Sequence, residues 1–87
     1  MQIKQLAMGN KEGLNAANAA RFVKVAGGFT SRIHVEKGNK KVDAKSIMGM
    51  LSLGVKYQDT LLIFIDGEDE KDAAAAIEKL FTSKFAL

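Results

Sequence analysis

The stretch TLLIFID, at positions 60–66, constrains the fold more than any other part of the chain. It is apolar at each position from Leu61 to Ile65, yet it is too short and too rich in β-branched and aromatic residues for a free-standing helix. We therefore expect a strand there. Because successive side chains of a strand point to opposite faces, this strand is apolar on both faces, which predicts a central position in a sheet.

The chain is short, and its core must form without cross-links. Its 87 residues include no cysteine, proline or tryptophan, which predicts one small domain over 1–87 with a core of aliphatic, methionine and phenylalanine side chains. Disulfides and thiolate zinc sites are thereby excluded. The N-terminal MQIKQLAMGNK contains no apolar run long enough for a signal peptide or a membrane span, so we expect a cytoplasmic protein that does not bind membranes.

Hydrophobic periodicity predicts three helices and three further strands. Helices are expected over 15–27, 46–54 and 67–81, where apolar residues recur at helical spacing. A weaker strand is expected at the N-terminus, with Leu6 and Met8 inward, and a β-hairpin over 32–42 turns through Gly38 and Asn39. This order predicts an α+β fold in which helices cover one side of a sheet.

Alternation within 60–66 raises the question of what covers the other side of the sheet. If positions 61, 63 and 65 face the helices, Leu62 and Phe64 lie on the open side beside Ile3, where a monomer should present polar groups. We take this as an indication of self-association. Stability in a hot environment is the competing explanation.

Two stretches carry a resemblance to a known family. FVKVAGGFTSRIHVEKGNKKVDAKSIMGMLSLG (22–54) and GEDEKDA (67–73) resemble HPr, the histidine-containing phosphocarrier of the bacterial sugar phosphotransferase system, and its regulatory relatives. The resemblance covers nearly the whole chain. It implies an open-faced β-sandwich of order βαββαβα, with a four-stranded antiparallel sheet (order 1-4-2-3) and three helices on one face.

The phosphohistidine motif of the family is only partly present. That motif is glycine, an aliphatic residue, histidine, any residue, arginine and proline; Gly13 and Leu14 match, but Asn15, Ala17 and Asn18 replace the histidine, arginine and proline. A carboxamide nitrogen has its lone pair delocalised into the carbonyl, so Asn15 cannot attack phosphorus as imidazole does. Ala17 removes the guanidinium that would bind phosphoryl oxygens. The resemblance therefore implies no catalytic residue here.

Asn15 has a structural interpretation beside the functional one. Asparagine is among the best N-caps, worth about 1 kcal/mol over alanine. Loss of a phosphoryl site and gain of a cap are compatible, and both predict the absence of phosphoryl transfer. The chain's single histidine, His34, is expected on the outward side of the hairpin, and we assign it no carrier role.

Ser46 is the second functional position that the resemblance implies, and here the match is intact. In regulatory members this serine is phosphorylated by HPr kinase/phosphorylase, and the product binds a LacI-type catabolite control protein. Phosphorylation adds about −1.5 to −2 charge, which is tolerated best at a helix N-terminus, and Lys45 is close enough to assist. Capping alone would favour a purely structural serine; the match of AKSIMGMLSLG (44–54) favours the regulatory role.

The resemblance also implies a partner-binding surface around this serine. Periodicity alone places Ile47 and Leu51 in the core with Met50 and leaves Met48 exposed, whereas the resemblance places all three flanking apolar residues in a docking patch. On the first helix, Val25 is expected to face water and, with the alanines there, to give an apolar surface that extends the patch. The predicted partner-binding residues are Ala16, Ala17, Ala20, Lys24, Lys45, Ile47, Met48 and Leu51.

These observations lead to two functional hypotheses. The first is a non-enzymatic regulatory HPr-like protein of carbon catabolite repression, switched at Ser46 and acting by protein binding, with a homodimer expected. The alternative is a sugar-uptake phosphocarrier with an altered site that still binds the first enzyme of the phosphotransferase system. We expect no cofactor or metal, since no ligand cluster or nucleotide loop is present. The lysine-rich turn EKGNKK (36–41) is expected to be solvated, with no nucleic-acid role.

Overall fold

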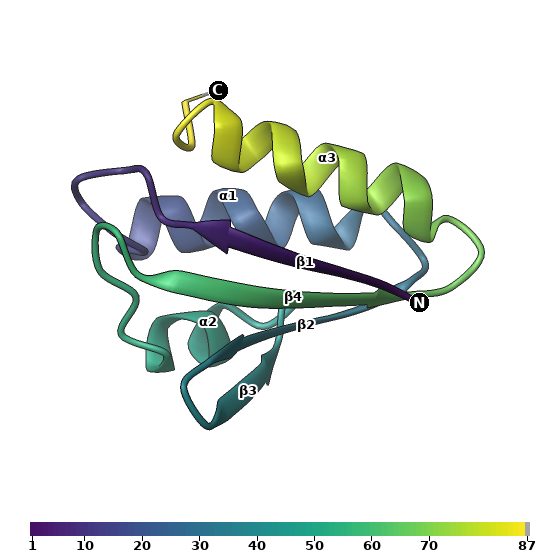
Figure 1. The fold of residues 1–87 in the computed structure, drawn as a ribbon, viewed down its shortest axis with the longest axis horizontal. Coiled ribbons are helices and arrows are strands. Elements are labelled where there is room, and N and C mark those ends of the chain that lie inside the picture. The colour runs from purple at the N-terminus through teal and green to yellow at the C-terminus, as the bar shows by residue number, and fades with distance from the viewer. Residues whose placement is uncertain (87) are drawn as a thin grey trace.

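The computed structural model describes residues 1–86 and contains a four-stranded sheet with three helices (Figure 1). The elements follow the predicted order. Their bounds are β1 Gln2–Ala7, α1 Ala16–Gly27, β2 Arg32–Lys37, β3 Lys40–Asp43, α2 Ile47–Ser52, β4 Thr60–Asp66 and α3 Glu70–Thr82.

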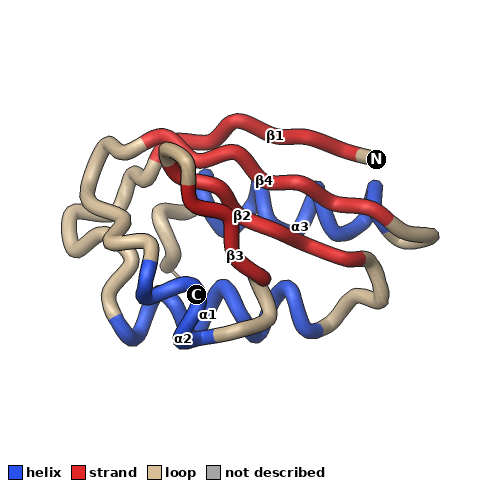
Figure 2. Tube along the Cα trace, turned by 90° about the horizontal axis from the view of Figure 1, so that it is seen from below, coloured by secondary structure: helices blue, strands red, loops and turns tan. Residues whose placement is uncertain are grey.

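The sheet has the order β1-β4-β2-β3, and each neighbouring pair is antiparallel. Strand β4 therefore lies between β1 and β2, with Ile65 opposite both Gln2 and Ile33, which confirms the central position expected for 60–66. The helices lie on one side of the sheet, and α1 and α3 run in opposite directions (Figures 1 and 2). The predicted α+β fold is confirmed.

The core lies between the sheet and the helices. Leu61, Ile63 and Ile65 of β4 are fully buried there, and Met8 and half-buried Leu6 point the same way, as alternation predicts. On the open face, Leu62 and Phe64 are only half-buried, and Lys41 places its Nζ 4.0 Å from the centre of the Phe64 ring. Beside them, Ile3 is 57% exposed.

The segment after α3 closes the core, which the periodicity did not predict. Phe85 is buried, and its ring centroid lies 5.0 Å from that of Phe81 and 6.3 Å from that of Phe22. The backbone reaches this position because Lys84 and Phe85 both adopt positive φ angles, 56° and 65°. Left-handed backbone is costly for such residues, so the burial of the phenylalanine ring must offset the strain.

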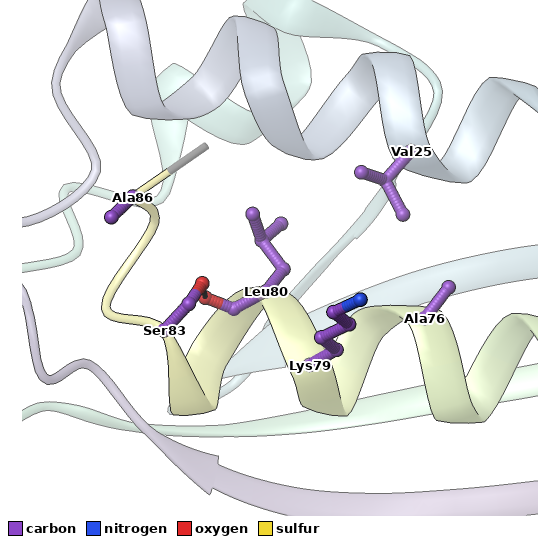
Figure 3. Close-up of a pocket in the computed structure, with 6 residues that line it drawn as sticks. All are labelled: Val25, Ala76, Lys79, Leu80, Ser83 and Ala86. Atoms are coloured by element: carbon purple, nitrogen blue, oxygen red, sulfur yellow. Dashed lines mark hydrogen bonds between the residues drawn. The ribbon is translucent and has the colours of Figure 1, made fainter.

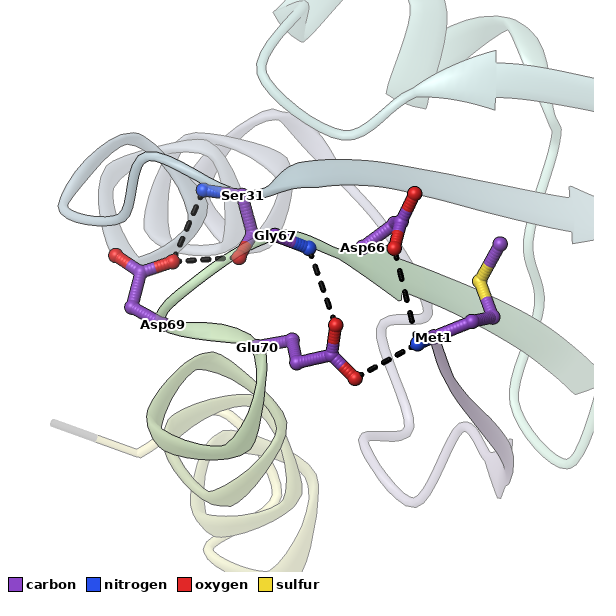
Figure 4. Close-up of polar contacts among 6 residues, drawn as sticks. All are labelled: Met1, Ser31, Asp66, Gly67, Asp69 and Glu70. Atoms are coloured by element: carbon purple, nitrogen blue, oxygen red, sulfur yellow. Dashed lines mark hydrogen bonds and ion pairs between the residues drawn. The ribbon is translucent and has the colours of Figure 1, made fainter.

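The acidic start of α3 has a different role from the one that helix-dipole reasoning suggests. The Asp69 carboxylate makes no capping bond to its own helix. It accepts hydrogen bonds from Ser31 N (3.0 Å) and Ser31 Oγ (Figure 4). It also accepts one from Thr30 N (2.8 Å), and so joins α3 to the start of β2. These bonds stabilise the charged form, the Ser31 hydroxyl first, and lower the pKa of Asp69 to about 2.

Glu70, beside it, makes a second connection. Its carboxylate accepts from Gly67 N and lies 2.8 Å from the Met1 ammonium group, which is also 3.7 Å from Asp66 (Figure 4). The ion pair with the ammonium group lowers the pKa of Glu70 and raises that of the Met1 amine. The first residue of the chain is thus held near the start of α3.

Candidate functional site

The beginning of α1 is built around Asn15. Its side chain accepts a hydrogen bond from Asn18 N at 2.9 Å, which confirms the predicted N-cap. The chain enters this cap through a turn at Gly13, where φ is 63° and an added Cβ would lie 2.5 Å from Val55 O. Leu14 donates its N–H to the same carbonyl at 3.0 Å. Only glycine fits at position 13 without strain. The turn also fixes the start of α1 against the segment that follows α2.

Asn18 is the residue at this site that sequence reasoning missed. It is 2% exposed, its Nδ2 donates to Gly13 O at 2.7 Å, and its Oδ1 accepts from Arg21 Nη1 at 2.9 Å. A buried amide side chain whose donor and acceptor both have hydrogen-bond partners has a structural role. It therefore ties the turn to the helix, in addition to replacing a proline of the family motif. Its carbonyl partner is that of Gly13, five positions earlier, and neither capping nor periodicity rules pair an amide side chain with that carbonyl.

The remaining predicted residues of α1 are exposed. Ala16, Ala17, Ala20 and Lys24 all face solvent, and α1 packs against α2, so these residues and the α2 surface belong to the same part of the molecule. One detail corrects the expectation for this helix. Val25, predicted to extend an apolar surface into water, is half-buried and packs against the core.

Ser46 begins α2 as predicted. Its Oγ accepts the N–H of Gly49 at 3.1 Å, and its carbonyl accepts the first intrahelical bond, from Met50 N at 2.9 Å. The residue is half-buried. An added Cβ at Gly49 would lie 3.3 Å from Ser46 Oγ, so the glycine leaves room for the cap. The hydroxyl oxygen thus lies at the edge of a surface helix of six residues.

The apolar residues of α2 correct the prediction from periodicity. Ile47 is 43% exposed, Leu51 37% and Met48 77%, while Met50 is fully buried. The core contact expected from Ile47 and Leu51 is made instead by Leu53, just after the helix. Periodicity fails here because α2 is short and apolar on more than one side, so spacing alone cannot identify the buried side.

Lys45 is exposed but already has partners. Its Nζ donates to Phe29 O at 2.7 Å, and its N–H donates to Asp43 Oδ1 at 2.8 Å. The side chain therefore spans from the β3–α2 connection to the α1–β2 loop. Its charge remains close to Ser46 in sequence, although its ammonium group is directed to a carbonyl.

A groove outside both positions lies between α1 and α3. Its lining is mostly apolar and is contributed by Val25, Ala76, Lys79, Leu80, Ser83 and Ala86 (Figure 3). None of the predicted site residues contributes to it. Within residues 1–86, we find no group of three or more metal-ligating side chains, and no helix has the length and apolarity to cross a membrane.

Comparison of the sequence with known proteins identifies the family of this chain. The family model of the PTS HPr component phosphorylation site matches residues 3–83. The chain belongs to the HPr family. Two curated HPr-family relatives are HPr-like proteins Crh: that of Halalkalibacterium halodurans is 46% identical over 85% of this chain and 88% of the relative, and that of Bacillus subtilis is 49% identical over 80% and 79%.

Solved structures of HPr proteins share the fold. The crystal structure of HPr-C-His from Thermoanaerobacter tengcongensis superposes with a TM-score of 0.95 at 47% identity, over 98% of this chain and 96% of that one. The crystal structure of Crh from Bacillus subtilis, described as a swapped, intertwined dimer, gives 0.75 at 42% identity over 88% and 87%. These solved structures thus include an HPr and a catabolite-repression protein.

Proposed function

We propose that this chain is a cytoplasmic regulatory HPr-like protein that does not carry phosphate on histidine, is phosphorylated on Ser46 and acts by binding a LacI-type catabolite control protein. It is not an enzyme in this proposal. The observation that carries it is the exposure of Ile47, Met48 and Leu51 next to the half-buried serine that caps α2. A monomer has no structural reason to expose three apolar side chains on one short helix.

The start of α1 supports the first part of the proposal. The Asn15 oxygen is occupied as a cap, and its amide nitrogen has no free lone pair. Ala17 offers no cation. His34, on the open face of the sheet opposite Phe64, belongs to another surface. A carrier function would need a nucleophile at the start of α1, and none of the exposed side chains from Asn15 to Ala17 is one.

The decisive test of the switch is phosphorylation by HPr kinase/phosphorylase with ATP. We expect one phosphoryl group per chain, located on Ser46 by tandem mass spectrometry and abolished by Ser46→Ala. Ser52→Ala is the matched control, because Ser52 is an exposed serine on the same helix whose Oγ donates to Gly49 O. Label that survives Ser46→Ala, or no label on the intact chain, would refute the switch.

The docking surface is tested with the phosphorylated protein and a LacI-type catabolite control protein. Replacing Met48 by serine should weaken binding about tenfold, because a central apolar contact in a well-packed interface is worth about 1–2 kcal/mol. Ile3→Ser is the control, since Ile3 is similarly exposed but lies on the sheet. Equal loss of affinity in both variants would exclude a specific patch on α2.

The alternative is a phosphocarrier whose histidine site has been altered and which still binds the first enzyme of the phosphotransferase system. Incubation with that enzyme and phosphoenolpyruvate distinguishes the two. Acid-labile, base-stable label on the unaltered chain would support the alternative and overturn the main proposal. A restoration variant should combine Asn15→His with Ala17→Arg and retain Asn18, because the structure gives that amide a buried role.

A homodimer formed by exchange of the first strand is a further part of the proposal. Strand β1 lies at the edge of the sheet, and the swapped Crh dimer of Bacillus subtilis shows that a relative associates by swapping. The exposed Ile3 would gain a contact in such an assembly. Light scattering over a concentration series should reveal a species of twice the chain mass; a constant monomer mass up to millimolar concentration would exclude it.

A further inference from the structure

The helix that carries the proposed docking patch has little support of its own. Helix α2 has six residues, well below the length at which a helix is stable alone in water, and of its residues only Met50 is buried. Besides Met50 and the packing against α1, contacts at its two ends therefore contribute to its orientation. The Ser46 cap fixes the first end.

The second end is held by lysines from the β2–β3 hairpin. Lys40 Nζ donates to Ser52 O at 3.2 Å, and Lys37 Nζ donates to Gly54 O at 2.9 Å. The last carbonyls of a helix have no intrahelical partner, and cations near them are favourable. The lysine-rich turn, expected from sequence to be a solvated loop, thus supplies the donors that close α2.

Lys37 also forms an ion pair with Asp59, in the turn before β4. Its Nζ lies 3.0 Å from Asp59 Oδ2, and that carboxylate also accepts Lys56 N at 2.8 Å. The backbone bond from Lys56 and then the bond from Lys37 lower the pKa of Asp59, so it stays charged at neutral pH. One ammonium group therefore links the hairpin, the exit of α2 and the turn that leads into β4.

We infer that Lys37 and Lys40 are positioning residues that fix the docking helix from its C-terminal end and so hold Ile47, Met48 and Leu51 in their binding orientation. The inference rests on the proposed function, because that function assigns a docking role to these three side chains. The lysines themselves need not contact the partner, because they act through the carbonyl groups of Ser52 and Gly54. Lys41, the next residue of the hairpin, lies over Phe64 and does not share this role.

The first test is amide hydrogen exchange on the free, full-length protein. In Lys37→Met with Lys40→Met, which removes both donors but keeps the apolar stems, exchange at Met50, Leu53 and Gly54 should accelerate about tenfold. Exchange at Ile63 and Ile65, in the middle of β4 and away from the Lys37–Asp59 pair, should not change. Arginine at both positions should restore protection, since it keeps a cationic donor, and Lys41→Met should have no effect on α2. Less than about a twofold change, or equal acceleration in β4, would overturn the inference.

The second test measures affinity of the Ser46-phosphorylated variants for the LacI-type protein. The methionine pair should weaken binding about threefold to tenfold, and the arginine pair should recover it. Faster exchange in α2 with unchanged affinity would overturn the positioning role. If the unaltered phosphoprotein fails to bind while exchange responds as expected, the lysine contacts stand and the proposed function is refuted. The two failures are therefore distinguishable.

Discussion

Replacing Asn18 provides the sharpest test of how the start of α1 is held. In Asn18→Ala the bond to Gly13 O (2.7 Å) and the bond from Arg21 (2.9 Å) are both lost. A hydrogen bond contributes about 1 kcal/mol, and a buried carbonyl left without a partner costs about 1–3 kcal/mol. We therefore expect a loss of about 2–3 kcal/mol in the free energy of unfolding.

Asn18→Pro should be more damaging than alanine, although proline is the family residue at this position. Proline also removes the backbone N–H that binds Asn15 Oδ1, and loss of an N-cap bond costs about 1 kcal/mol. The expected total is about 3–4 kcal/mol. The difference between the two variants includes the cap bond and the restriction that proline places on the helical backbone of Ala17.

Urea unfolding followed by circular dichroism measures these losses. With a slope of about 1 kcal/mol per molar urea, the alanine variant should unfold at a midpoint about 2–3 M lower. Asn39→Ala is the control, since Asn39 is an exposed turn residue and should change the midpoint little. A decrease below about 0.5 M in Asn18→Ala, or a proline variant as stable as the alanine variant, would refute the structural role.

Three further predictions concern other positions. The pKa of Asp69 is about 2 in the folded protein and 3.8 for a free aspartate. Its contribution to the free energy of unfolding is therefore present above about pH 4 and is lost as the pH falls through about 2. Asp69→Asn should be less stable than the parent at pH 7, and the urea midpoints of the two proteins should converge near pH 2. Gly13→Ala should destabilise by more than about 1 kcal/mol because of its positive φ and the clash with Val55 O, whereas Gly27→Ala, with open space around the added methyl, should stabilise by about 0.5–1 kcal/mol in thermal unfolding. Met48→Ser should leave the melting temperature within about 2 °C of the parent, because a side chain that is 77% exposed contributes little to the core.

The sheet could be predicted from sequence because its pattern is local. In β4, alternate residues are buried, and the caps Asn15 and Ser46 were identifiable from residue type and spacing. The fold followed from these signals and from the family resemblance.

The missed features depend on contacts between distant segments. Asp69 binds backbone and side chain 38 and 39 positions earlier, and Lys37 and Lys40 reach carbonyls 17 and 12 positions later. No periodicity encodes such distances. Phe85 reaches the core only through left-handed backbone, which sequence patterns rarely signal.

The burial of the α2 side chains could not be predicted from the sequence either. An apolar face predicts burial only if another element covers it, and Ile47 and Leu51 of α2 are partly exposed to water. The misassignment is informative, because residues that should be buried and are not are where a partner is expected to bind.

The pairing of β1 with β4 also bears on how the chain is made. Gln2 lies opposite Ile65 and Ala7 opposite Thr60, so the first strand leaves the ribosome long before its neighbour in the sheet has been translated. At about 5–20 residues per second, this leaves roughly 3–13 s in which β1 is unpaired. On a crowded polysome, the unpaired β1 of one nascent chain could pair with the β4 of an adjacent chain. In the proposed strand-exchanged dimer, the extent of exchange would then depend on translation rate and ribosome spacing as well as on the concentration of finished chains.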